Sequence, residues 1–374
     1  MNYKYEQMLM HDISLSDTYV NTHFDFRIDD QALSKSATER IFDYAQRLAQ
    51  DKDIAVGNDL WSIIGKHHQE LIETCIRRNY EDFWRITKAI SKTSNVVGFM
   101  NQFPYSKLES IEECRQIDAY HCIDKLISLA ECLAVVPVLN PEQGGWQVVD
   151  PDFVPYFKSA FKCNGAVIPP PPAGGGAFGI KTNLGVYSPK DLVGRCTGGQ
   201  VVNLCKLHAL DRIHEIGGGL GFVAYYAAKL GNFPYALFDL PAVSIMQAHF
   251  LMRSLGEENV YLDGEQEAHE RGVLLRPFWR IAAEGKSNVL WLNQDSLPEI
   301  YFNIGKSFIS KISSTRRGFF LSINQESTAN NWLGGEQHRV PDLIADEKGL
   351  IRQYRCRDFM RLGYVEELYV IGNT

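Results

Sequence analysis

The chain has 374 residues, of which 45% are hydrophobic and 22% are charged, with 30 glycines and 15 prolines. This composition is typical of ordered globular proteins and excludes collagen-like, coiled-coil and disordered chains. The 38 Lys and Arg residues against 45 Asp and Glu residues give a net charge of -7, which disfavours a nucleic-acid partner. At this length we expect two domains, or one large domain with an appendage, whose core needs neither disulfide bonds nor a metal.

The eight cysteines are scattered, without a C-x-x-C pair or a Cys/His cluster at zinc spacing. We therefore expect free thiols in a reducing, cytoplasmic compartment. The amino-terminal sequence MNYKYEQMLM lacks the basic-then-apolar pattern of a secretory signal, and no stretch is long and apolar enough to span a membrane. The sequence predicts a soluble protein without a membrane partner.

Residues 1–165 show mostly helical periodicity. Ser36 and Glu39 fit a capping box, and apolar residues follow at helical spacing, so we expect a helix that starts at Ser36. Further amphipathic helices are expected within residues 60–75, 83–90 and 108–135. We therefore predict a helical N-terminal domain over residues 1–165 that binds substrate, carries a homo-oligomer contact, or does both.

The composition changes at residues 166–200, where Pro169 to Pro172 directly precede Gly174, Gly175 and Gly176. Prolines stiffen an extended segment, whereas glycines permit positive φ and close backbone approach. Two interpretations stay open for this segment. It is either an interdomain linker or a loop that covers a bound substrate.

After residue 200 the pattern alternates between short apolar runs and helical stretches. Strands are expected at residues 212–216, 235–239, 287–293, 318–324 and 364–371. Helices are expected at residues 201–210, 221–230, 243–255 and 301–313. Either residues 259–262 or residues 272–275 could form the third strand. The alternation predicts an α/β domain over residues 201–374, with a mostly parallel sheet covered by helices on both faces.

The motif with the strongest chemical content is EIGGGLG at residues 215–221, between an apolar strand and a helix. Its glycines let the backbone turn sharply and approach a ligand, and ligands of open α/β sheets bind at the carboxyl ends of strands. The acid before the glycines, Glu215, would repel a pyrophosphate but attract an ammonium group. Asp239 closes the next strand, where a carboxylate can accept both ribose hydroxyls. S-adenosylmethionine, which has a sulfonium, an amino group and a ribose but no phosphate, fits this pattern.

The same residues leave two other hypotheses open. Gly219-Leu-Gly221-Phe-Val-Ala224 matches the G-x-G-x-x-A form of the dinucleotide fingerprint, with Asp239 twenty residues after Gly219. An NAD(P)-dependent oxidoreductase is therefore the second hypothesis. A non-catalytic scaffold, in which the glycine-rich turn binds no ligand, is the third. The position of Glu215 and the mid-chain place of the motif favour S-adenosylmethionine.

Polar clusters follow two further strands. Asn293, Gln294, Asp295 and Ser296 come directly after VLWL, with Glu299 close behind, and Asn324 opens a similar cluster, NQES, after the fifth strand. Amide and carboxylate groups at adjacent strand ends favour an acceptor rich in hydroxyls, such as a sugar or a polyol. The alternative is that these residues cap the following helices.

The segments HEIGGGLGFVAYYAAKLG, FDLPAV, LNQDSLPEI and RLGYVEELYVI resemble a family of sugar O-methyltransferases from polysaccharide and natural-product gene clusters. The resemblance covers residues 165–374 and implies a Rossmann-like methyltransferase sheet that uses S-adenosylmethionine. It implies that Glu215, Gly217, Gly219 and Asp239 lie at the cofactor. The predicted cofactor set is Glu215, Gly217, Gly218, Gly219, Gly221, Asp239, Leu240, Asn293 and Gln294, and the predicted acceptor set is Ser296, Glu299 and Asn324.

Methyl transfer to an alcohol is an in-line displacement that needs alignment and a base for the hydroxyl proton. The candidate bases are Asp295, Glu326 and His338. We favour Asp295 because it follows a clear strand, whereas the path of the chain around His338 cannot be read from the sequence. Asp295, Glu299 and Glu326 could converge on a divalent metal, but nothing in their spacing demands one, and we predict no metal site.

Overall fold

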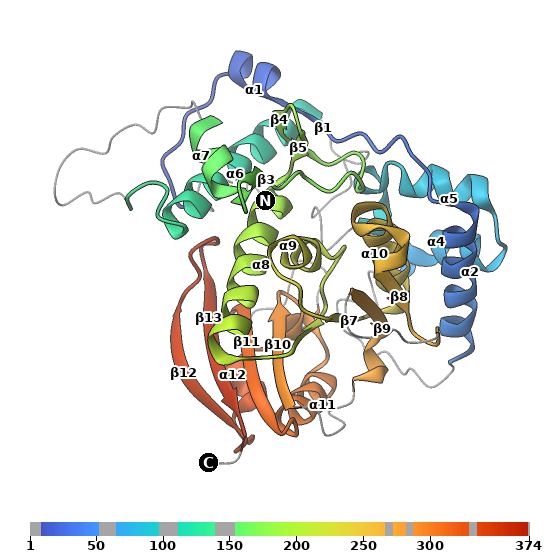
Figure 1. The fold of residues 1–374 in the computed structure, drawn as a ribbon, viewed down its shortest axis with the longest axis vertical. Coiled ribbons are helices and arrows are strands. Elements are labelled where there is room, and N and C mark those ends of the chain that lie inside the picture. The colour runs from blue at the N-terminus through green and yellow to red at the C-terminus, as the bar shows by residue number, and fades with distance from the viewer. Residues whose placement is uncertain are drawn as a thin grey trace.

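The computed structural model describes most of the chain (Figure 1). The described residues are 9–51, 65–96, 111–138, 154–265, 272–281, 287–328 and 335–372. A mixed sheet of eight strands forms the centre of the molecule, and helices from the first part of the chain gather beside it.

The first part of the chain is mostly helical, as predicted. Its helices are α1 (Asp17–His23), α2 (Lys35–Gln50), α4 (Gln69–Ile76), α5 (Tyr80–Thr87), α6 (Ile111–Cys132) and α7 (Val154–Ala160), with short turns η2 (Gly65–His68), η3 (Ile90–Lys92) and η4 (Ser94–Val96). The predicted starts of the helices at residues 60 and 108 lie outside the described residues. Apolar faces of α2, α4, α5 and α6 pack into one core together with residues from the second half of the chain, such as Leu237 and Leu251.

The capping box predicted at Ser36 and Glu39 is wrong. Helix α2 starts two residues earlier, because the Ser34 side chain accepts the amide hydrogen of Ala37 at 3.0 Å. Glu39 then lies one turn inside the helix, where its carboxylate contacts Tyr80. Ser34 and Ser36 are both of a residue type that favours the N-cap position, so the local sequence does not distinguish them. The contact of Glu39 with Tyr80 is consistent with a helix capped by Ser34.

Residues 166–200 form ordered structure that is largely buried. They contain β3 (Ala166–Val167), β4 (Phe178–Thr182), β5 (Gly185–Tyr187) and the first half of α8 (Pro189–His208), and β3 pairs with β2 (Lys162–Cys163). Strand β1 (Phe24–Phe26) pairs with β4, and residues 173–180 are all buried. The helix expected from residue 201 therefore starts at Pro189, inside the Pro/Gly-rich segment. The domain boundaries remain predictions.

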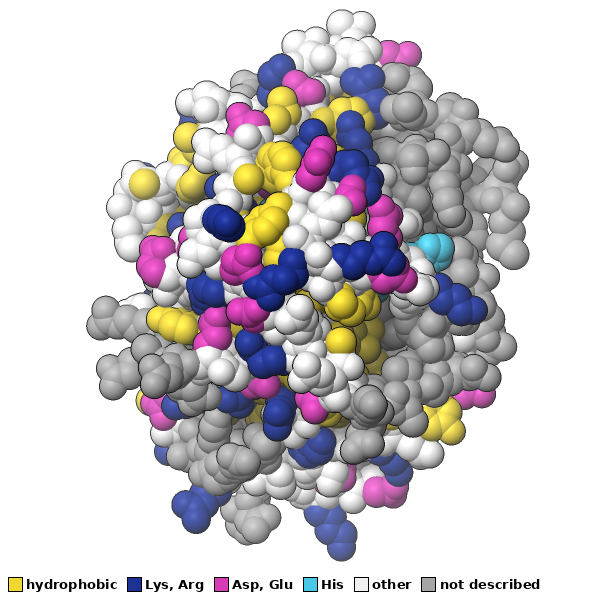
Figure 2. All heavy atoms as spheres, turned by 90° about the vertical axis from the view of Figure 1, so that its right-hand side faces the viewer, with side chains coloured by type: hydrophobic (Ala, Val, Ile, Leu, Met, Phe, Trp, Pro, Cys, Tyr) yellow, Lys and Arg dark blue, Asp and Glu magenta, His cyan; other side chains and the backbone are white. Residues whose placement is uncertain are grey.

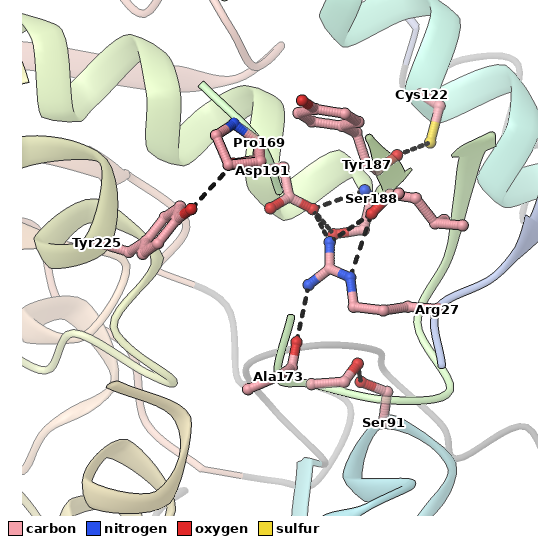
Figure 3. Close-up of polar contacts among 12 residues, drawn as sticks. Arg27, Ser91, Cys122, Pro169, Ala173, Tyr187, Ser188, Asp191 and Tyr225 are labelled. Carbon is pink, nitrogen blue, oxygen red and sulfur yellow. Dashed lines mark hydrogen bonds and ion pairs between the residues drawn. The ribbon is translucent and has the colours of Figure 1, made fainter. Parts of the chain in front are cut away.

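A buried ion pair fixes this segment to the N-terminal part of the chain (Figure 3). Arg27 contacts Asp191 in the first turn of α8 and donates to the carbonyl oxygens of Ala173 at 3.2 Å and Val186 at 2.8 Å. Asp191 also accepts from the Tyr226 hydroxyl at 3.0 Å. Because each charge is paired and hydrogen-bonded, the pair can be tolerated in the interior, and loss of one partner would leave the other unpaired.

The large sheet has the order β12-β13-β11-β10-β6-β7-β9-β8. Its strands are β6 (Arg212–Ile216), β7 (Tyr235–Asp239), β8 (Val260–Leu262), β9 (Val273–Pro277), β10 (Ser287–Gln294), β11 (Arg317–Gln325), β12 (Leu350–Arg357) and β13 (Tyr364–Ile371). All neighbouring strands are parallel except β13, which is antiparallel to both β11 and β12. Both candidate third strands form, with β9 beside β7 and β8 at the edge. The sequence missed β12 because this edge strand is polar and exposed.

Helices cover both faces of the sheet. They are α9 (Phe222–Leu230), α10 (Pro241–Leu255), α11 (Phe302–Ser313) and α12 (Val340–Ile344), with short turns η6 (Glu257–Asn259), η7 (Phe278–Arg280) and η8 (Leu297–Glu299). One core joins α8, α9 and α10 to the sheet, and a second core joins α11 and α12 to the other face. The predicted fold class, a Rossmann-like methyltransferase sheet preceded by a mostly helical region, is confirmed. No helix in the described ranges has the length and apolar character that a membrane crossing requires.

Candidate functional site

The glycine turn after β6 has the geometry that the sequence predicted. Gly217, Gly219 and Gly221 have φ values of 70°, 56° and 97°, in the left-handed region that favours glycine. Gly221 is the N-cap of α9. A Cβ at Gly217 would lie 2.1 Å from the Ser296 hydroxyl, so close packing within the protein also requires glycine here.

Glu215 lies beneath this turn. Its side chain is buried, and its Oε2 accepts a hydrogen bond from the Tyr235 hydroxyl at 2.7 Å. A Cβ at Gly218 would lie 2.8 Å from Oε2, so the turn packs directly on the carboxyl group. Burial, with the negative charge of Asp239, raises the pKa of Glu215 to about 8. The group is therefore mostly neutral at pH 7, whereas the sequence suggested an ionised carboxylate on a pocket floor.

Asp239 joins the end of β7 to the same turn. Its carboxylate accepts from the Leu240 amide and from the Gln247 side chain, each at 2.8 Å, and from the amides of Gly218 and Gly219. Gln247 also donates to the Gly219 carbonyl at 2.8 Å. Burial raises the pKa of Asp239 to about 7, although these donors oppose the shift. The structure thus brings Asp239, Leu240 and the glycine turn together.

Three residues of the predicted site bind mainly to the protein itself. Asn293 donates to the Ile216 carbonyl at 2.9 Å, and the Ser296 hydroxyl donates to the same carbonyl at 3.2 Å. Asn324 donates to Asn293 Oδ1 at 3.0 Å. These bonds tie together the ends of β6, β10 and β11. The buried Oδ1 of Asn324 and the buried Oε1 of Gln294 have no hydrogen-bond partner among the described residues. Ligand roles for the residues at these strand ends stay predictions.

Asp295 follows β10 with φ of 74°, a left-handed conformation that Asp and Asn adopt more readily than most side chains. Its two carboxylate oxygens accept from one nitrogen of Arg361 at 2.7 and 2.6 Å, and the Tyr364 hydroxyl also donates to it. Burial would raise the pKa of Asp295, but Arg361 and then Lys190 outweigh it and hold the pKa below its usual range. Asp295 is therefore a firmly ionised group with a weak affinity for a proton.

The pKa of Glu299 is shifted in the opposite direction to that of Asp295. It ends the short turn η8, and burial, followed by the negative charge of Asp295, raises its pKa to about 8. Lys190, from the first turn of α8, interacts with both carboxyl groups, and burial lowers the pKa of its ammonium. Two neighbouring carboxyl groups whose pKa values are driven apart are a recurrent feature of acid and base catalysis.

Lys190 and Arg361 are not among the site residues that the sequence predicted. Lys190 lies in a segment interpreted as a linker or a loop over the substrate. The sequence therefore does not show that Lys190 interacts with the acids at the strand ends. Arg361 precedes β13, whose first residue, Tyr364, pairs with Gln325 at the end of β11. An antiparallel strand beside β11 brings its start to the carboxyl ends of the parallel strands. That position is a signal from which Arg361 could have been found.

The other two candidate bases lie in different surroundings. Glu326 forms an ion pair with Arg355 of the edge strand β12, and this hydrogen bonding lowers the pKa of Glu326. The His338 amide donates to the Pro298 carbonyl at 2.9 Å, and its ring packs against Phe302. His338 Nε2 is buried without a hydrogen-bond partner among the described residues. Within those residues, no three acidic, His or Cys side chains form a group that could hold a metal.

An open groove of about 520 Å³ lies elsewhere, against α2, α5 and α10. Its lining includes Leu33, Tyr80, Trp84 and His249. His249 follows Gln247 by two positions on α10, which places the two side chains on opposite sides of the helix. The groove is therefore separated from the glycine turn.

On the face that carries α2, α4 and α5, Lys and Arg are interspersed with Asp and Glu, without a large patch of one charge among the described residues (Figure 2).

No family model matches the chain, and no curated protein matches it. The chain is similar to a magnesium protoporphyrin IX methyltransferase from Synechocystis PCC 6803 with bound SAH, at 15% identity and a TM-score of 0.36, over 50% of this chain and 86% of that chain. It is also similar to an O-methyltransferase family protein from Burkholderia thailandensis, at 13% identity and a TM-score of 0.35, over 50% of this chain and 60% of that chain. At these TM-scores the likenesses do not bear on function, and the residues of this chain carry the assignment.

Proposed function

We propose that this protein is an S-adenosylmethionine-dependent O-methyltransferase that acts on a hydroxyl of a sugar or polyol-like acceptor. The observation that carries the proposal is the junction of Asp239 with the positive-φ glycine turn, with Glu215 beneath it. Asp239 places a hydrogen-bond acceptor at the carboxyl end of β7, beside the turn that follows β6. This acceptor suits ribose hydroxyls, and neither Asp239 nor the mostly neutral Glu215 offers a positive charge that would favour a pyrophosphate.

The donor set fits such a cofactor. Asp239 is an acceptor for ribose hydroxyls, and two of its present donors, the amides of Gly218 and Gly219, belong to a turn whose glycines can change conformation. Gln294, at the end of β10, has a buried Oε1 without a partner among the described residues. We assign cofactor binding to these groups. When bound, S-adenosylmethionine supplies a methyl group already activated by its sulfonium.

We further propose Glu299, rather than Asp295, as the base. The contact of both its carboxylate oxygens with one nitrogen of Arg361 keeps Asp295 ionised and holds its carboxylate in place, so Asp295 suits the orientation of a hydroxyl group. Glu299 has a pKa of about 8, so its carboxylate binds a proton readily while part of the population is ionised near neutral pH. In this arrangement Glu299 takes the acceptor proton, and the Lys190 ammonium stabilises the ionised form of Glu299 before the transfer.

The same region favours a hydroxyl-rich acceptor. Arg361 Nη2, Gln325 Nε2 and Asn324 Oδ1 are buried polar atoms without partners among the described residues, and they come from β11 and from the residues just before β13. A hydroxyl group both donates and accepts hydrogen bonds, so a polyol can satisfy donors and acceptors of this kind together. An apolar acceptor would leave them unpaired at a cost of about 1–3 kcal/mol each.

Thermal unfolding with different ligands tests the proposal. A ligand at a hundred times its Kd stabilises the folded state by about 2.7 kcal/mol. We expect S-adenosylmethionine and S-adenosylhomocysteine to raise the melting temperature of the wild type, and to raise that of the Asp239→Asn variant far less. Stabilisation by NAD or NADP alone would favour the oxidoreductase hypothesis. No response to any of the four ligands would favour the scaffold.

A further inference from the structure

Three thiols from separate elements gather beside one buried guanidinium group. Cys132 is the last residue of α6, Cys163 belongs to β2, and Cys196 lies within α8. Arg195 interacts electrostatically with all three. The residue is 7% exposed, and its Nε has no hydrogen-bond partner among the described residues. A buried cation with an unused donor favours the thiolate form of a neighbouring cysteine.

Cys132 and Cys196 are in direct contact. Their Sγ atoms are 3.7 Å apart, and one thiol donates a hydrogen bond to the other. A disulfide bond is about 2.0 Å long, so the two Sγ atoms need to move less than about 2 Å closer to form one. Cys132 is exposed and lies at a helix end, where its side chain can rotate. Cys163 Sγ, in contrast, contacts the Lys229 carbonyl at 4.0 Å.

The two thiols differ in reactivity. The hydrogen bond from Cys196, with a smaller contribution from Arg195, holds the pKa of Cys132 below its ordinary range, although burial, Glu366 and Asp358 oppose it. The pKa of Cys196 is raised by its hydrogen bond to Cys132 and by burial. The exposed thiol therefore reacts first, and the half-buried thiol is placed to resolve the product.

We propose that Cys132 and Cys196 form a reversible disulfide bond that joins α6 to α8. With oxidised glutathione as the oxidant, the Cys132 thiolate attacks one glutathione sulfur and releases one glutathione thiolate. Cys196 then loses its proton to solvent, attacks Cys132 Sγ and displaces the second glutathione. The two cysteines lose two electrons and two protons in total, and one oxidised glutathione becomes two reduced molecules. This inference does not depend on the proposed function.

The proposed bond adds a cross-link to helix α8. Helix α8 begins at Pro189, so its first turn holds Lys190, which interacts electrostatically with Asp295 and Glu299, and Asp191, which pairs with Arg27. A cross-link at Cys196 ties this helix to α6 and closes a long loop of chain. We expect the oxidised protein to melt roughly 5 °C or more above the reduced protein, because the cross-link restricts the unfolded state.

The experiment incubates the reduced full-length protein with mixtures of reduced and oxidised glutathione, blocks free thiols by alkylation, and maps the peptides by mass spectrometry. We expect a Cys132–Cys196 bond in the wild type, which dithiothreitol removes. Cys356, which is exposed on β12, should become a mixed disulfide with glutathione and so reports that the oxidant is active. The Cys163→Ser variant should keep the bond.

The Cys196→Ser variant separates the two steps. We expect it to accumulate glutathione on Cys132, because the resolving thiol is missing. If glutathione instead accumulates on Cys132 in the wild type, or if both thiols stay reduced while Cys356 reacts, the proposal is wrong. A bond from Cys132 to Cys163 or to Cys356 would equally overturn it. The wild-type map decides the question even if a variant folds poorly.

Discussion

Glu215→Gln tests the burial of the carboxyl group beneath the glycine turn, and it needs no ligand. The pKa of Glu215 rises from an ordinary 4.5 to about 8 in the folded protein. A group with a raised folded pKa stabilises the protein fully below its unfolded pKa, and this contribution is lost as the pH rises through the folded pKa. Between pH 5 and pH 8 the loss is roughly 3 kcal/mol for this shift. Glutamine does not titrate, and its Oε1 can still accept from the Tyr235 hydroxyl.

Urea unfolding of the wild type and the variant from pH 5 to pH 8 measures this effect. We expect the free energy of unfolding to fall with pH in the wild type, and to fall by roughly 3 kcal/mol less in Glu215→Gln. Most of the slope that belongs to Asp239 remains in both proteins, because burial is the largest cause of its raised pKa. Glu336→Gln, at an exposed position, serves as the control and should follow the wild type. Parallel curves for Glu215→Gln and the wild type would show that the carboxyl group is hydrated or already ionised, and would refute the reasoning.

Four further predictions concern the strand ends and the buried ion pair. Asp239→Ala should weaken the binding of S-adenosylhomocysteine about tenfold or more in calorimetry, because it removes a charge-assisted acceptor; an unchanged Kd would contradict the cofactor assignment. Glu299→Gln should lower kcat about a hundredfold or more. Asp295→Asn should instead move the acidic limb of the pH–rate profile to lower pH, because the charge of Asp295 raises the pKa of Glu299; the reverse pattern in steady-state rates would return the role of base to Asp295. Arg27→Met should cost about 3–5 kcal/mol in urea unfolding, and Asp191→Asn added to it should recover part of that loss, since the buried charge left behind is removed; strictly additive losses would contradict this account.

The sequence determined the elements whose signals are local. Apolar runs of strand length alternating with helical periodicity predicted most strands of the large sheet, because burial on both faces requires continuous apolar strands. The glycine turn was predicted because positive φ at Gly217, Gly219 and Gly221 is a demand of the backbone itself. The end of β7 at Asp239 was also predicted, because the apolar run of the strand stops at this acid, although its carboxyl group is itself buried.

Tertiary structure decided the direction in which each polar side chain points and the partner that it meets. The sequence shows amides and acids after β10 and β11, but it does not show that Asn293 turns inward to the Ile216 carbonyl while Asp295 turns to Arg361. It likewise cannot show that Lys190 approaches Glu299, because these residues are far apart in the chain and only the packing of α8 brings them together. Proton affinity in this cluster depends on burial and neighbouring charge, which are properties of the folded arrangement.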